Sequence, residues 1–138
     1  MVENPLLASA GRFHGHIGPF LALGLKIGLM VNEMMGRSPF ETKAIVRVSP
    51  NPPRSCLVDG IQFSTGCTMG KANIEIQPDD ERIEVEFQRG ERKVTISVIN
   101  DFLKTLEKEL EGRDERTIID YASRIMDTSP EEMFEVHE

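Results

Sequence analysis

The segment from residue 17 to residue 35, IGPFLALGLKIGLMVNEMM, constrains the fold more than any other part of the chain. Gly18 and Pro19 predict a helix start, because a proline in the first turn gives up no hydrogen bond that the helix would otherwise form. Large apolar residues lie on nearly every side of this helix, so we expect it to be buried all round. In a chain of 138 residues, a second subunit is one surface that could bury its second face. Gly24 and Gly28, four residues apart, would let a neighbouring backbone approach closely.

Composition restricts the class of protein. Lys26, Asn32 and Glu33 interrupt the apolar segment, which indicates a buried helix and not a membrane span. The N-terminus has no signal-peptide pattern. The two cysteines, Cys56 and Cys67, are too few for a secreted fold stabilised by disulfides, so we expect a cytoplasmic protein. The net charge is −7 and basic residues are interleaved with acidic ones, which argues against a nucleic-acid partner.

Alternating hydrophobic patterns predict four strands and, together with the helices, an α+β fold. We expect a single domain over residues 1–138, with the element order α-β-α-β-β-β-α-α and two helices packed on one mixed four-stranded sheet. A last turn is expected to begin at Ser129. The predicted helices cover about 18–35, 55–64, 100–111 and 114–127, and the predicted strands cover about 43–49, 72–77, 82–88 and 93–99.

Residues that can carry chemistry are expected to meet at one end of this arrangement. A right-handed crossover through the second helix makes the strands before and after it parallel, and the first two helices then have their N-termini at the same end of the domain. His14 and His16, which we expect on an extended segment, therefore converge there with Cys56. Asp59 lies three residues after Cys56, over the same helix face.

These residue types suit a metal site. The helix dipole is expected to lower the pKa of the Cys56 thiol, and two imidazoles with one thiolate form an incomplete zinc shell that leaves a position for water or substrate. The structural alternative stays open, because a His-x-His pair is more often structural and a cysteine at a helix start is often only a small buried residue. Cys67 is expected about 15 Å away, at the far end of the helix, unless its loop folds back or a second subunit supplies one of the thiols.

Two separated motifs resemble one family. FHGHIGPFLALGLKIG and, later in the chain, SCLVDGIQFSTGCTMGKANIEI closely resemble the FmdE-like family of formylmethanofuran dehydrogenase proteins, over a core from residue 12 to about residue 98. The family pattern is a His-x-His-x-Cys-Pro-Gly segment followed by Cys-x-x-Asp-x-Ile-Gln and Thr-Gly-Cys-Thr-x-Gly-Lys. The matching positions here are His14, His16, Pro19, Gly24, Cys56, Asp59, Gln62, Thr65, Gly66, Cys67, Thr68, Gly70, Lys71 and Asn73.

The resemblance implies an α-β-α-β-β-β core, related to the catalytic domain of glyceraldehyde-phosphate dehydrogenases, and an intertwined dimer with a metal-binding active site. Such a dimer would bury the second face of the first helix and could bring Cys67 to the site. Two positions depart from the family, because Gly18 stands where the family has a cysteine and Phe20 replaces a glycine. The missing thiolate implies weaker metal binding, other ligands or no metal. No cysteine follows Cys67, so residues 100–138 are expected to be a helical extension without the zinc finger that some members carry.

We therefore expect a cytoplasmic homodimer that binds a divalent transition metal, with zinc as the favoured ion. The expected ligands are His14, His16, Cys56 and Cys67. Asp59 would support one ligand or act as a fourth, and Lys71 would stabilise negative charge that develops on a substrate. The resemblance also implies other formylmethanofuran dehydrogenase-type subunits as partners, and those subunits hold the tungsten or molybdenum chemistry. The alternative is a non-catalytic accessory or small-ligand-binding domain that has lost the metal.

Overall fold

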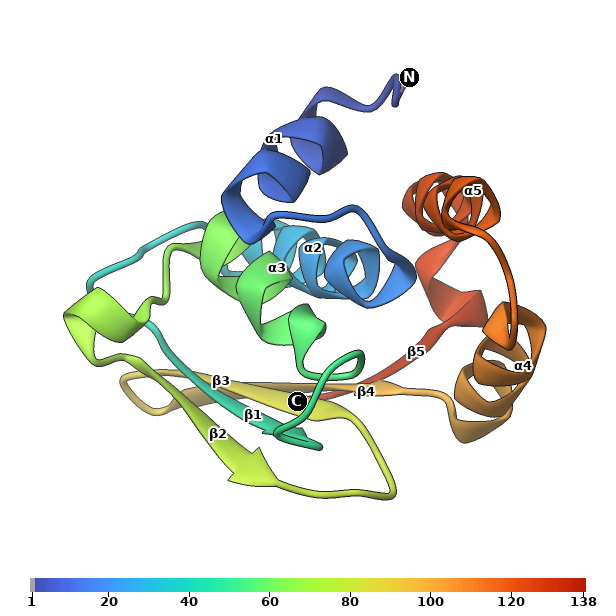
Figure 1. The fold of residues 1–138 in the computed structure, drawn as a ribbon. Coiled ribbons are helices and arrows are strands. Elements are labelled where there is room, and N and C mark those ends of the chain that lie inside the picture. Colours follow the sequence, from blue (N-terminus) through green and yellow to red (C-terminus); the bar gives the residue numbers. More distant parts are fainter. Residues whose placement is uncertain (1) are drawn as a thin grey trace.

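The computed structural model describes residues 2–138. Its helices are α1 (Pro5–His14), α2 (Pro19–Met35), α3 (Cys56–Thr65), α4 (Asn100–Leu110) and α5 (Glu115–Asp127), with short 3-10 turns at Met69–Lys71 and Pro130–Glu132. Its strands are β1 (Lys43–Val48), β2 (Ile74–Pro78), β3 (Glu84–Arg89), β4 (Arg92–Val98) and β5 (Phe134–His137). Figure 1 shows α2 and α3 over one face of the sheet, with α1 on their far side. The predicted α+β class is confirmed.

The sheet is mixed and five-stranded, in the order β2-β1-β3-β4-β5. β1 and β2 are parallel, as predicted from the crossover through α3, and the other neighbours are antiparallel. The prediction of four strands is wrong by one, because Phe134–His137 pairs with β4. Phe134 lies opposite Val98 and is buried, although only four residues form this strand and they offer too little alternation to be recognised.

A helix before α2 was also absent from the prediction. The Asn4 side chain caps α1 by accepting a hydrogen bond from the Leu7 backbone N–H at 3.0 Å, and Pro5 occupies the first turn. His14 is consequently the last residue of a helix and not part of an extended segment. Gly15, with φ of 101°, then turns the chain toward α2 in a conformation that favours glycine.

α2 is buried by other parts of its own chain. A Cβ atom on Gly24 would lie 2.1 Å from the carbonyl oxygen of Leu57, and one on Gly60 would lie 2.4 Å from the carbonyl oxygen of Leu21. The two helices therefore pack backbone against backbone at Gly24 and Gly60, whereas Gly28 makes room for the side chains of Ser64 and Thr65 on α3. The neighbouring backbone at Gly24 is therefore α3, and the first half of α2 is buried within its own chain, whereas Leu29 in the second half is 40% exposed.

No single helix within residues 2–138 is both long enough and apolar enough to cross a membrane. α1 and α2 meet that criterion only as a pair, and they are bent by 120° at their junction. The ammonium group of Lys26, within α2, donates to the carbonyl oxygens of Met126 and Thr128 at 3.1 and 3.0 Å. This positive charge thus lies against the C-terminus of α5, where the helix dipole favours it.

The face of the sheet opposite α2 and α3 carries charged side chains. Arg47 pairs with Glu84 at 2.7 Å and with Glu86 at 3.1 Å. A hydrogen bond from Gln88, together with the bonds from Arg47, holds the pKa of Glu86 below its ordinary value. One face of the sheet is therefore packed and the other polar, as an antiparallel arrangement permits.

Candidate functional site

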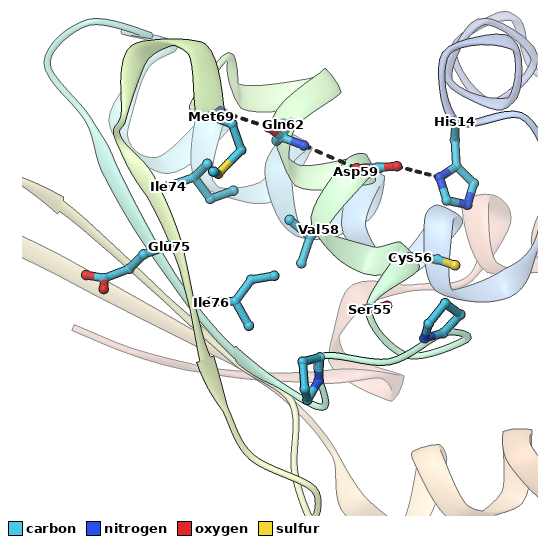
Figure 2. A pocket seen from close by; sticks show the side chains of 12 residues that line it. His14, Ser55, Cys56, Val58, Asp59, Gln62, Met69, Ile74, Glu75 and Ile76 are labelled. Carbon is cyan, nitrogen blue, oxygen red and sulfur yellow. Dashed lines mark hydrogen bonds and ion pairs between the residues drawn. The ribbon is translucent and has the colours of Figure 1, made fainter.

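The site is built around a hydrogen bond between His14 and Asp59. Nδ1 of His14 lies 2.6 Å from Oδ2 of Asp59, so the end of α1 is joined to the first turn of α3. The His14 side chain is 15% exposed and the Asp59 side chain 37% exposed. Figure 2 shows Nε2 of His14 on the side of the ring that faces away from Asp59. The imidazole is therefore held through one nitrogen and offers the other to its surroundings.

Cys56 lies beside His14, at the first position of α3. Figure 2 shows its Sγ atom on the side of the His14 ring that carries Nε2. Burial raises the pKa of the Cys56 thiol, and the negative charge of Asp59 raises it further. The predicted lowering of this pKa by the helix N-terminus is wrong, because desolvation outweighs the favourable backbone interaction there. Without a metal, the thiol is the favoured form at neutral pH.

Two pockets share His14 and Cys56 as part of their walls. The first has a volume of about 470 Å³ and lies between α3 and the edge strand β2. In Figure 2, Ile74 and Ile76 point from β2 toward Val58 of α3 and form the apolar side of this pocket. The second has a volume of about 250 Å³, and its lining residues are His14, His16, Gly18, Pro19, Phe20, Leu21, Pro53, Cys56, Leu110 and Ile118. None of the described residues that line either pocket is a lysine or an arginine.

His16 and Gly18 lie next to each other in the second pocket. His16 is exposed, in the connection between α1 and α2. Gly18 has extended backbone angles, φ −148° and ψ 170°, which any residue can adopt. A Cβ atom built on Gly18 would lie 3.5 Å from both Cε1 and Nδ1 of the His16 ring. A cysteine at this position would therefore place its thiol beside His16.

Cys67 and Lys71 lie outside both pockets. Cys67 is fully buried, its Sγ donates to the carbonyl oxygen of Thr42 at 3.4 Å, and it follows the opposite end of α3 from Cys56. Nζ of Lys71 donates to Oγ1 of Thr68 at 2.9 Å. Within one chain, neither residue is brought to His14, so the structure separates them from the other predicted site residues.

The donors around the pockets do not form a closed metal shell. Across residues 2–138, no three His, Cys, Asp or Glu side chains are placed so that they could hold one metal ion. His14, His16 and Cys56 nevertheless line the same pocket, and imidazole and thiolate are ligands that zinc prefers. Imidazole and thiolate groups suit zinc, but in this conformation the three side chains are not placed to hold one ion together.

Gln62 is a site residue to which the sequence assigned no role. Its Nε2 donates to Oδ1 of Asp59 at 3.2 Å, and its Oε1 accepts from the Met69 backbone N–H at 3.0 Å. The signal was the spacing, because Gln62 follows Asp59 by three residues on the same helix and therefore shares its face.

Comparison with known proteins agrees with the motifs. A protein of Archaeoglobus fulgidus described as "Probable S-adenosyl-L-methionine-binding protein" is 38% identical over 74 residues. That similarity covers 50% of this chain and 19% of the other protein, so the chain spans about a fifth of the length of this relative. Residues 13–135 match the family described as "FmdE, Molybdenum formylmethanofuran dehydrogenase operon". Since this match takes in both motifs and nearly all of the fold, the chain belongs to the FmdE family.

Proposed function

We propose that this protein binds a divalent transition metal, zinc first, through His14, His16 and Cys56. The observation that carries the proposal is the 2.6 Å contact between His14 Nδ1 and Asp59 Oδ2. A carboxylate behind a histidine fixes the ring and makes its other nitrogen a better metal ligand, as in many zinc sites. Cys56 lies on the side of that other nitrogen, and both residues line one pocket (Figure 2).

His16 is the residue that would complete the set. Its side chain is exposed and follows the Gly15 turn, so bringing its ring to the metal disturbs no packed contact of the core. Two imidazoles and a thiolate leave one position for water or a substrate, and a zinc ion there acts as a Lewis acid toward that ligand. Cys67 and Lys71 are left out of the proposed site, because Cys67 is fully buried and neither residue lines either of the two pockets described above.

Zinc binding by the protein purified without a histidine tag tests the proposal. We expect the wild type to bind one zinc ion per chain, and His16→Ala to weaken the affinity by about 100-fold. The melting temperature of the metal-free His16→Ala variant should not change, because the His16 residue is exposed. His137→Ala is the matched control, since His137 is also exposed but lies on β5, and it should leave affinity and melting unchanged.

Two outcomes contradict the metal site. Substoichiometric zinc in the wild type, measured by elemental analysis after zinc loading and desalting, favours the second candidate described next. Unchanged zinc affinity with a lower melting temperature in His16→Ala would assign His16 a packing role instead.

Binding of a small ligand without metal is the second candidate function. It is favoured by the lack of a three-donor group in residues 2–138 and by the apolar side of the larger pocket, formed by Val58, Ile74 and Ile76. The relative named for S-adenosyl-L-methionine suggests one probe, a positively charged molecule, and Asp59 is the carboxylate of the larger pocket that could attract it, since Glu75 points away in Figure 2 and pairs with Lys43 at 3.2 Å. Calorimetric titration of the metal-free protein should give a binding heat that Asp59→Asn reduces, and no heat in the wild type excludes this ligand.

We also propose that the protein is a homodimer, on the basis of its exposed apolar side chains. Phe13, Phe40 and Met69 are 56%, 86% and 71% exposed. Met69 lines the larger pocket, and Phe40 lies near the same turn, with Nζ of Lys71 5.5 Å from its ring centroid. Phe13 packs on Phe63 of α3 with ring centroids 5.7 Å apart. Light scattering at micromolar concentration should give about twice the chain mass of 15.5 kDa, and Phe40→Ser should lower it. A wild-type mass near 15.5 kDa would contradict the dimer.

A further inference from the structure

A continuous chain of hydrogen bonds runs from the loop after α3 to His14. The Met69 backbone N–H contacts Gln62 Oε1 at 3.0 Å, and Gln62 Nε2 contacts Asp59 Oδ1 at 3.2 Å. The other carboxylate oxygen, Oδ2, contacts His14 Nδ1 at 2.6 Å. Figure 2 shows the three bonds in sequence across the face of α3. Metal binding through Nε2 of His14 does not by itself require the Met69–Gln62 and Gln62–Asp59 bonds.

The direction of the first two bonds follows from the backbone donor. A backbone N–H can only donate, so the Gln62 atom that it meets must be the carbonyl oxygen Oε1. The remaining Gln62 atom is then the amide nitrogen, which can only donate, and Asp59 Oδ1 must accept. When Asp59 is ionised, its second oxygen Oδ2 can only accept, and His14 Nδ1 is then the donor.

We infer that Gln62 is a positioning residue that sets the tautomer of His14 through Asp59. The proton of the neutral imidazole is held on Nδ1, and the lone pair of Nε2 faces the pockets. The use of this tautomer in function rests on the proposed metal site, because a histidine nitrogen must be unprotonated to bind a metal. The tautomer itself is a property of the metal-free protein and can be measured without any ligand.

Gln62 is needed because little else fixes the Asp59 carboxylate. Among the described residues, Asp59 forms an ion pair only with His14, and no lysine or arginine holds it. Its side chain is 37% exposed, so water competes for both oxygens. Gln62 in turn is oriented by the Met69 N–H, which belongs to the short turn Met69–Lys71. The loop after α3 thus helps to hold the Asp59 carboxylate in place against His14 Nδ1.

The tautomer of His14 in the metal-free protein tests the inference. Two-bond ¹⁵N–¹H correlation spectra, recorded with a chelator at a pH where the ring is neutral, distinguish a protonated Nδ1 from a protonated Nε2. The wild type should show a protonated Nδ1. Gln62→Met keeps the length of the side chain but removes both amide groups, and it should give a mixture of the two tautomers. Gln88→Met is the matched control, since Gln88 also donates to a carboxylate but on the opposite face of the sheet, and its His14 signals should match those of the wild type.

The inference is overturned if the wild type shows a protonated Nε2, or if Gln62→Met keeps the wild-type tautomer. Zinc affinity is the second readout, and we expect Gln62→Met to lower it by about 10-fold or more while Gln88→Met leaves it unchanged. The two proposals fail separately. A wild type that binds no zinc removes the proposed metal site while the tautomer result stands, and intact zinc affinity with an unchanged tautomer in Gln62→Met removes the role of Gln62 while the metal site stands.

Discussion

Gly24→Ala is expected to lower the free energy of unfolding by about 3 kcal/mol or more. In an unconstrained helix the same change stabilises by about 1 kcal/mol, so the expected sign is opposite to helix propensity. The reason is the contact with α3, because the new Cβ would lie 2.1 Å from the Leu57 carbonyl oxygen. A backbone oxygen cannot turn away as a side chain can, so the two helices must separate and lose their packing. Urea denaturation followed by circular dichroism measures the change.

Gly70→Ala is the matched control. The nearest atom to a Cβ at Gly70 is Oγ1 of Thr68 at 3.9 Å, an ordinary contact, so the free energy of unfolding should stay within about 0.5 kcal/mol of the wild type. Equal stability of the two variants would contradict the close α2–α3 contact. A loss in Gly24→Ala that disappears at high protein concentration would instead assign Gly24 to a contact between subunits.

Gly18→Cys is expected to tighten zinc binding by about 100-fold, equivalent to about 3 kcal/mol. The backbone at Gly18 is extended and accepts a side chain, and the new Cβ would lie 3.5 Å from the His16 ring. The thiol would enter the pocket that His14, His16 and Cys56 already line, and it would add the fourth ligand of a tetrahedral zinc site. Competition with a chromophoric chelator measures the affinity.

Gly18→Ala separates the thiol from the effect of filling space. It adds the same Cβ atom without a sulfur, and the zinc affinity should remain that of the wild type. If Gly18→Cys and Gly18→Ala bind zinc equally, the metal ligands do not lie around this pocket. If both lose zinc, the added Cβ has displaced His16.

Periodicity was sufficient to predict the elements that bury a clear face. The strands β1 to β4 and the helices α2 to α5 show alternation or helical spacing, and the right-handed crossover then predicted the parallel pairing of β1 with β2. α1 was missed because Gly11 lies within it and disfavours a helix, whereas the tertiary contact with Ile17 requires that glycine. β5 was missed because it is short and is stabilised by pairing with β4.

The site was predictable to the extent that helix direction determines it. The direction of α2 and α3 brought His14, His16 and Cys56 to one pocket, although His14 proved to end α1. The pKa of Cys56 was not predictable, because it depends on burial and on the nearby charge of Asp59. The hydrogen bonds of Gln62 also depend on how the later loop folds over α3, which no local pattern records.

The wall of the second pocket comes from a different part of the chain than its donors. Leu110 ends α4 and Ile118 lies in α5, whereas the imidazoles and the thiol precede β2. Lys26 of α2 donates to two backbone carbonyl oxygens at the end of α5. These contacts do not depend on which side chains α5 carries. In the proposed site, the shape of the pocket and its donor atoms are thus separable: we expect that exchanging Leu110 or Ile118 for larger or smaller residues alters which ligand shape is admitted, while His14 and Cys56 keep their positions.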